Sequence, residues 1–97
     1  MPTYAVQLEL TQQGIENIKE GPSRVEAGRE LVESMGGELH DIYLTMGSSD
    51  YIAIVEAPDD KTAAKVALSL GQEGSIRTQT SRAFTMEEYR EIVDGLP

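Results

Sequence analysis

The chain has no cysteine and no tryptophan, and only one histidine and one phenylalanine among its 97 residues. Without cysteine, disulfide bonds, thiolate catalysis and zinc–thiolate sites are excluded. No segment approaches the roughly 20 apolar residues of a membrane-spanning helix. The N-terminal residues do not join a basic stretch to an apolar one, as a secretory signal would. We therefore expect a cytoplasmic protein with no membrane partner.

Basic residues are also scarce. Eight Lys and Arg stand against 17 Asp and Glu, and the formal net charge is −9. Nucleic-acid phosphates must be met by clustered Lys and Arg, so we expect no nucleic-acid partner. The length is that of a single domain over residues 1–97, and a domain of this size gains stability from a partner subunit.

The first half of the chain predicts three strands and one long helix. Residues 4–10 alternate between apolar and polar side chains, which is typical of a strand with one apolar face. Apolar residues recur at helical spacing over residues 22–35, and two glycines follow. Residues 38–45 favour a strand of imperfect alternation. A hairpin loop at 47–50 then leads to a continuous apolar strand at 51–56.

The second half predicts a helix, a strand and a final helix. Pro58-Asp59-Asp60 opens a helix by capping, and residues 75–84 alternate as a strand. Thr85 and Glu88 form a capping box at the start of the C-terminal helix. The apolar residues of that helix are expected to face inward: Met86, Tyr89, Ile92 and Val93.

This order of elements indicates an α+β fold, a ferredoxin-like β-α-β-β-α-β sandwich with an extra C-terminal helix. Right-handed crossovers place the first and third strands in the centre of the sheet. Helices then cover only one face. Alternation assigns several apolar residues to the other face, which is too apolar to stay in water: Ala5, Tyr51, Ala53, Val55 and Ala83. We therefore predict a homodimer through the open sheet face, a dimeric α/β barrel, and leave a higher oligomer open.

The run Thr45-Met46-Gly47, Asp50 and residues 52–60 resembles the signature of the GYD domain family, which belongs to the dimeric α/β-barrel superfamily. The resemblance covers nearly the whole chain, and it implies the same fold and the same dimer. It continues in these segments: Gly14-Ile15, Ile18-Lys19, Gly36-Gly37, Leu68 to Gly71, Gly74, Arg77-Thr78, Thr80, Arg82-Ala83-Phe84 and Glu87-Glu88.

One position departs from the family pattern. Ser49 stands where the family's motif has its tyrosine, which puts in question any role that rests on that phenol. Relatives in the wider superfamily include cofactor-free monooxygenases, haem-degrading enzymes, isomerases and ligand-sensing domains. The resemblance therefore selects no single activity.

Three side chains are candidates for a general base: His40, Tyr43 and Asp50. His40 titrates near neutrality and could also ligate haem, or it is a partly exposed strand histidine without a chemical role. Asp41 follows it directly and is expected on the opposite strand face. Asp50 lies in the hairpin loop, either at a pocket mouth or as an acceptor for local backbone amides.

Five residues are candidates for ligand binding: Asp50, Glu56, Thr78, Thr80 and Arg82. Glu56 ends a central strand and needs a partner. The candidates are Arg82 on the neighbouring strand and Arg77 from the other face or from the other subunit. Thr78, Thr80 and Arg82 share one strand face, which lines either a cavity under the helices or the dimer interface. Asp59 and Asp60 are read as helix caps rather than metal ligands. We expect no metal site and no cofactor.

The fold and these residues lead to three hypotheses of function. The first is a binding or sensing module that holds a small, partly apolar molecule between sheet and helices. The second is a cofactor-free monooxygenase or isomerase with His40, Tyr43 or Asp50 as base. The third is a purely structural oligomer subunit. The sequence does not identify the ligand, the reaction or the size of the oligomer.

Overall fold

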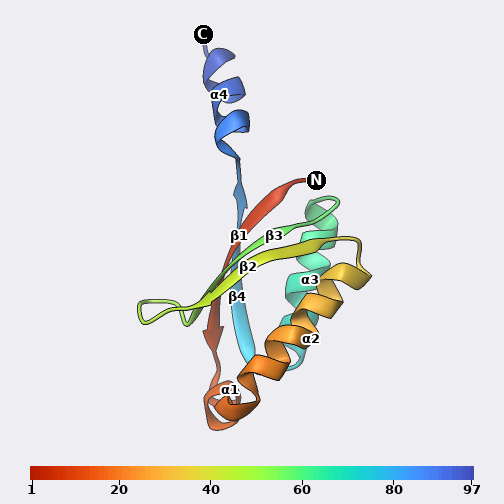
Figure 1. Cartoon of the computed structure of the whole chain (residues 1–97), viewed down its shortest axis with the longest axis vertical. Coiled ribbons are helices and arrows are strands. Elements are labelled where there is room, and N and C mark those ends of the chain that lie inside the picture. The colour runs from red at the N-terminus through yellow and green to blue at the C-terminus, as the bar shows by residue number, and fades with distance from the viewer.

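A four-stranded sheet with two helices on one face forms the body of the protein (Figure 1). The structure is a computed structural model that describes all residues, 1–97. None of its helices is long and apolar enough to cross a membrane. The elements in chain order are β1 (Thr3–Leu10), α1 (Gln12–Glu16), the 3₁₀ turn η1 (Ile18–Glu20), α2 (Gly21–Ser34), β2 (Glu38–Leu44), β3 (Tyr51–Glu56), α3 (Asp60–Gln72), β4 (Ile76–Ala83) and α4 (Met86–Asp94).

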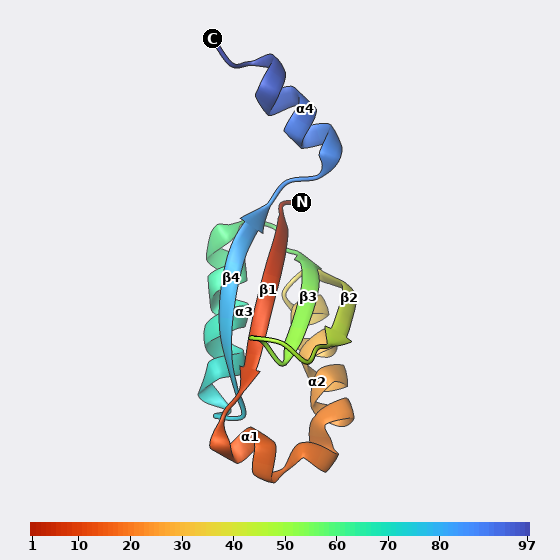
Figure 2. The same cartoon turned by 90° about the vertical axis from the view of Figure 1, so that its left-hand side faces the viewer.

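The strands run antiparallel in the order β2-β3-β1-β4, with β1 and β3 in the centre. On β1, Tyr4 lies opposite Val55 of β3 and Arg82 of β4. The helices α2 and α3 lie behind the sheet in the view of Figure 2, and no helix covers the face turned toward the viewer. The predicted ferredoxin-like α+β fold is therefore confirmed.

Local sequence signals set the helix ends. The Asp59 side chain accepts a hydrogen bond from the Thr62 amide and caps α3. Thr85 and Glu88 form the predicted capping box of α4, with both reciprocal bonds present. Gly36 follows α2 with a φ of +84°, a conformation that L side chains rarely adopt.

The turn before β4 is closed by α1. The amide of Thr11 donates to the carbonyl oxygen of Ser75 at 3.0 Å, and the Thr11 hydroxyl donates to the carbonyl of Gly74. A Cβ at Gly14 would collide with that same Ser75 carbonyl. Glycine at this position therefore lets α1 lie directly against the chain entering β4.

The predicted composition of the open sheet face was partly wrong. The register places Tyr51, Ala53 and Val55 opposite Leu8, Val6 and Tyr4, and all six line the space beneath the helices. The open face carries the intervening residues of β3, Ile52 and Ile54, with Ala5 and Ala83 as predicted. Because β3 is apolar on both faces, its alternation does not show which residues face the helices.

A bulge in β2 accounts for the imperfect alternation of residues 38–45. The pairing with β3 shifts between Leu39 and Asp41. Leu39 lies opposite Val55 on the helix-covered face, and Asp41 lies opposite Ile54 on the open face. The bulge therefore brings Asp41 to the same face as His40, whereas regular alternation predicted the opposite face.

The C-terminal helix does not pack where the sequence predicted. α4 projects away from the sheet and helices of its own chain (Figures 1 and 2). Its apolar side chains are exposed rather than inward: Met86, Tyr89, Ile92 and Val93. An amphipathic pattern indicates that a helix buries one face, but it does not indicate against which surface.

Candidate functional site

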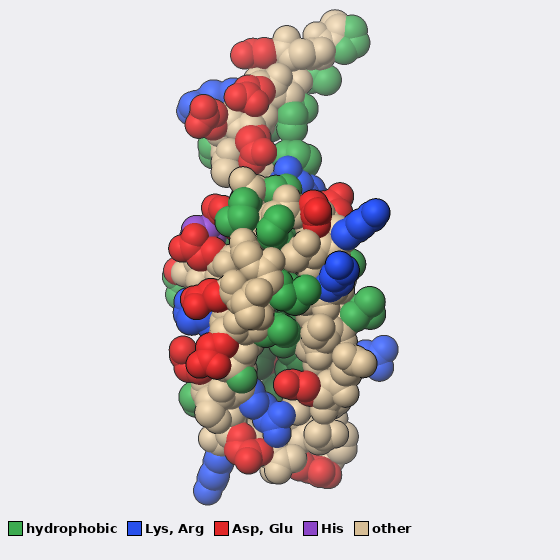
Figure 3. Space-filling model, turned by 90° about the vertical axis from the view of Figure 1, so that its right-hand side faces the viewer, with side chains coloured by type: hydrophobic (Ala, Val, Ile, Leu, Met, Phe, Trp, Pro, Cys, Tyr) green, Lys and Arg blue, Asp and Glu red, His purple; other side chains and the backbone are tan.

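A cavity of about 100 Å³ lies between the sheet and the two helices α2 and α3. Of the 23 residues that line it, 17 are hydrophobic, so an occupant would be held mainly by apolar contact. Figure 3 shows the helix-covered side of the molecule, where a hollow with hydrophobic side chains opens at the surface. The cavity is therefore reachable from solvent.

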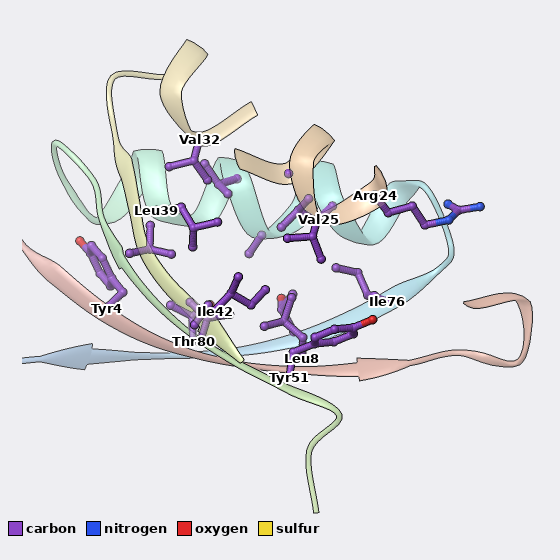
Figure 4. Close-up of a pocket in the computed structure, with 18 of the residues that line it drawn as sticks. Tyr4, Leu8, Arg24, Val25, Val32, Leu39, Ile42, Tyr51, Ile76 and Thr80 are labelled. Atoms are coloured by element: carbon purple, nitrogen blue, oxygen red, sulfur yellow. The ribbon is translucent and has the colours of Figure 1, made fainter. Parts of the chain in front are cut away.

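The sheet forms the floor of the cavity and the helices form its roof (Figure 4). Leu8, Leu39 and Ala53 are the buried core of the floor, with exposures of 7%, 7% and 4%. Val25 and Val32 come from α2, and Val66 and Leu70 come from α3. These side chains present no charge to the interior.

Polar groups gather at one end of the cavity. Figure 4 shows the Tyr51 hydroxyl and the Arg24 side chain at this end, with the guanidinium directed away from the interior. Arg24 Nη1 donates to Ser75 Oγ at 2.6 Å, and Nη2 lies 3.2 Å from Glu20 Oε2. Arg24 Nε is buried and has no hydrogen-bond partner. Tyr51 and Arg24 are therefore the polar residues at this end of the cavity.

Two of the five predicted ligand-binding residues line this cavity. Thr78 and Thr80 project into it from β4. Arg82 lines a separate groove, described next. Asp50 and Glu56 line neither hollow.

A groove of about 260 Å³ lies between α3 and β4. The Tyr4 hydroxyl donates to Asp60 Oδ1 at 2.5 Å within it. Burial, together with Asp60, raises the pKa of Tyr4 to about 12. The Arg82 guanidinium lies 5.8 Å from the centre of the Tyr4 ring and 4.6 Å from that of Phe84. The groove thus holds a fixed phenol, a carboxylate and a guanidinium.

His40 forms a contact on the open sheet face. Its Nε2 lies 2.7 Å from Glu56 Oε1, and its Nδ1 lies 3.8 Å from Glu38 Oε1. The hydrogen bond with Glu56 raises the pKa of His40 above its usual value, and the charges of Glu38, Glu56 and Asp41 act in the same direction. The predicted pairing of Glu56 with Arg82 was wrong, because His40 contacts Glu56 and Arg82 lies 3.8 Å from Glu88. Pairing with Arg77 of a second subunit stays a prediction.

Asp50 connects the β2–β3 loop to the end of β1. Its carboxylate accepts a hydrogen bond from the Leu10 amide at 2.8 Å, and its own amide donates to the Leu8 carbonyl at 2.9 Å. Tyr43 is 64% exposed on β2. No hydrogen bond joins any two of the candidate bases His40, Tyr43 and Asp50. No group of three or more His, Cys, Asp and Glu side chains is placed to hold a metal ion.

Sequence reasoning missed four polar residues of the two hollows: Tyr4, Arg24, Tyr51 and Asp60. One signal was available, since a tyrosine on the apolar face of a strand needs a partner for its hydroxyl once it is buried. Nothing in the sequence indicates which residue supplies that partner. Tyr4 and Asp60 are 56 positions apart and meet only through the fold.

Comparison with known proteins gives one family, one curated relative and several structural neighbours. The family described as GYD domain matches residues 4–93. The relative, from Thermus thermophilus, is named "Glutamine synthetase and cystathionine beta-lyase binding protein". It is 34% identical over 89 residues, which are 91% of this chain and 94% of the relative.

The structural neighbours show the fold alone. TTHA0845 from Thermus thermophilus has a TM-score of 0.57 and 22% identity, over 88% of this chain and 95% of that one. The feast or famine regulatory protein from M. tuberculosis, complexed with L-methionine, has a TM-score of 0.67 and 13% identity, over 88% of this chain and 51% of that one. The chain therefore spans about half the length of that regulator.

We predict a pH-dependent contribution of His40 to stability. Because its pKa is raised on folding above 6.5, the protonated ring stabilises the folded state. That contribution is complete below pH 6.5 and is lost as the pH rises through the raised pKa. His40→Gln should therefore lower the free energy of unfolding more at about pH 5.5 than at about pH 8.5, measured by urea denaturation at fixed protein concentration.

Glu56→Gln serves as the matched control. In that background the substitution of His40 should lose most of its pH dependence, because the principal partner of the ring is neutral. An equal loss of stability at both pH values would contradict a charged His40–Glu56 contact.

Proposed function

The chain belongs to the GYD domain family, and on this premise we propose that it is a homodimeric binding module that holds a small, mostly apolar molecule between sheet and helices. The observation that carries the proposal is the cavity of about 100 Å³. Protein interiors contain few voids larger than a water molecule, and an empty apolar void lowers stability. A bound molecule would supply the van der Waals contacts that the side chains around an empty void lack.

The size and lining of the cavity limit its occupant. An apolar cavity of about 150 Å³ is known to bind benzene. A volume of about 100 Å³ is smaller, so it suits at most a single small ring or a short branched chain, and it is too small for a whole porphyrin. None of the candidate bases His40, Tyr43 and Asp50 lines the cavity, which supports binding rather than turnover in it.

The open sheet face supports the homodimer. Ile52 is 38% exposed there, and Ile54 and Ala5 lie opposite each other across the two central strands. Four strands about 4.8 Å apart and about 7 residues long offer only some 450 Å² per face. A stable interface of standard size needs about 800 Å² from each partner. The sheet face alone is therefore too small.

The C-terminal helix supplies further apolar surface. Tyr89, Ile92 and Val93 on α4 are 55%, 46% and 45% exposed, and α4 projects beyond its own domain (Figure 2). We propose that the apolar side of α4 packs against the second copy of the chain when the two sheets face each other. The area that the sheet lacks is then contributed by α4.

A second candidate function is suggested by the curated relative. That protein is named for binding glutamine synthetase and cystathionine beta-lyase, and the match spans nearly the whole of both chains. The β2–β3 hairpin tip offers a surface for such a partner, with Leu44 at 71% exposure and Met46 fully exposed. Exposed apolar side chains that gather at one place mark interaction sites, and methionine adapts to varied partners. We assign the enzyme-binding surface to this tip.

Occupancy of the cavity is tested with small aromatic probes. Benzene and phenol, each at about tenfold its Kd, should raise the Tm of the wild-type protein by at least about 4 °C. Gly28→Leu should abolish the shift, because Gly28 lines the cavity and only Leu70 lies near its Cβ position. Ala27→Leu, on the exposed side of α2, should retain it.

Native mass spectrometry of the purified protein completes the test of the cavity. A bound small molecule that is absent from Gly28→Leu would identify the natural occupant. If no probe raises the Tm and no extra mass is found, the binding proposal is rejected.

The dimer is tested by charge substitution on each proposed contact surface. Ile52→Lys and Ile92→Lys should each convert the dimer to the 10.6 kDa monomer, because each buries a charge in an apolar interface. Leu68→Lys, at a residue of α3 that is 73% exposed, should leave the dimer intact. Sedimentation velocity distinguishes the outcomes. A monomeric wild-type protein would exclude the dimer. If Ile52→Lys abolishes the dimer and Ile92→Lys does not, the proposed contact of α4 is excluded.

Binding to metabolic enzymes is tested with purified glutamine synthetase and cystathionine beta-lyase from the same organism as this chain. We expect co-sedimentation with at least one of them. Met46→Glu should weaken binding at least about tenfold, since it places a charge in an apolar contact. Leu68→Glu should have no effect. Failure of both enzymes to co-sediment with the wild-type protein would reject this function.

A further inference from the structure

We propose that the groove between α3 and β4 is a second binding site, and that it takes a free α-amino acid with an apolar side chain of small or medium size. It adjoins the inner cavity described above and shares Tyr4, Ala63, Ala67 and Thr80 with it, whereas Asp60, Ala64 and Arg82 line the groove alone. The proposal stands whether or not that cavity is occupied, because it rests on Asp60 and Arg82, which do not line the cavity.

The shape of the groove suits a small molecule. Its volume is about 260 Å³, below the range of about 300–1,000 Å³ for the pockets of drug-sized ligands. One wall is a row of small side chains on α3, Ala63, Ala64 and Ala67. Because no polar group projects from this wall, it favours contact with an apolar side chain.

The opposite wall and one end carry opposite charges. Arg82 projects from β4 and Asp60 begins α3, and both line the groove. They are not paired with each other. Arg82 Nη1 donates to the carbonyl oxygens of Thr3 and Ala83, and its Nη2 has a long contact of 3.8 Å with Glu88. Asp60 accepts a single hydrogen bond, from Tyr4. The groove therefore holds one guanidinium and one carboxylate that both retain hydrogen-bonding capacity.

These two groups together match a zwitterion. A planar guanidinium pairs with a carboxylate through two parallel hydrogen bonds. An ammonium group needs acceptors, which Asp60 and the Thr80 hydroxyl supply. A ligand with a carboxylate alone would be repelled by Asp60, and one with an amine alone by Arg82. An α-amino acid satisfies both groups at once.

Both charged groups are held in place before a ligand arrives. Arg82 lies over the Phe84 ring at 4.6 Å and donates to the Thr3 carbonyl at 3.3 Å. Tyr4 is 4% exposed and fixes Asp60 through its hydroxyl. With its pKa raised to about 12, the phenol stays a donor throughout the physiological range. Such preorganisation lowers the entropic cost of binding. Tyr4 is thus a positioning residue for this site.

The test uses NMR on the full chain labelled with ¹⁵N. Each of the twenty L-amino acids is added at up to about 10 mM, above the Kd of about 1 mM that marks a weak site. We expect saturable shifts of the backbone amides of Asp60, Ala64 and Arg82, which line the groove and not the inner cavity, for at least one apolar amino acid. For L-leucine the two analogues are 4-methylpentanoate, which lacks the ammonium group, and 3-methylbutylamine, which lacks the carboxylate. The analogues of the binding amino acid should bind at least tenfold more weakly.

Two substitutions and two controls assign the binding to the proposed groups. Arg82→Gln and Asp60→Asn should each weaken binding about tenfold or more, and asparagine still accepts the Tyr4 hydrogen bond. Arg77→Gln and Asp41→Asn alter the same residue types outside the groove and should have no effect. The proposal is overturned if no amino acid shifts the groove residues, if an analogue binds as tightly as the parent, or if the shifts fall on Val32 and Leu39 in the inner cavity.

Discussion

Small side chains where the helices meet the sheet determine the shape of this protein. Gly28 on α2 and Ala63 and Ala67 on α3 face the same interior as Ala53 on β3. Helices pack about 8–10 Å apart, at a distance set by the residues in contact, and large side chains would fill the space between them. Here they do not, and a cavity remains beneath the helices while a groove remains beside α3. Both proposed ligand sites follow from this distribution of volume.

The net charge of −9 limits what such hollows attract. An acidic surface repels free anions over a Debye length of about 8–10 Å in salt. Arg24 lies at one end of the cavity and Arg82 lies in the groove, so each hollow has one local cation in a negative surrounding. Neutral molecules and zwitterions are not opposed by the overall field. The two ligand classes proposed here share that property.

The sequence predicted the elements and their order because local rules govern both. Capping by Asp59 was predicted from its place at the helix start, and the capping box from Thr85 and Glu88 three positions apart; both are confirmed. The sequence did not show which residues of β3 face the helices, because both faces of this strand are apolar. The Tyr4–Asp60 and His40–Glu56 contacts were missed because each joins residues far apart in the chain. No local rule encodes which distant side chains a fold brings together.

Successive side chains of β1 point to opposite faces of the sheet, and this places the proposed ligand sites and the proposed dimer contact on different sides. Tyr4 projects toward the helices and borders both the cavity and the groove. Ala5, the next residue, projects to the open face opposite Ile54. Ligand sites therefore lie on one side of the sheet and the proposed dimer contact lies on the other, so a second copy on the open face leaves both hollows uncovered. An effect of a cavity ligand on assembly must then pass through the strands, of which β1 is shared by both sides. A ligand in the groove has a second route, because Arg82 contacts Glu88 of α4.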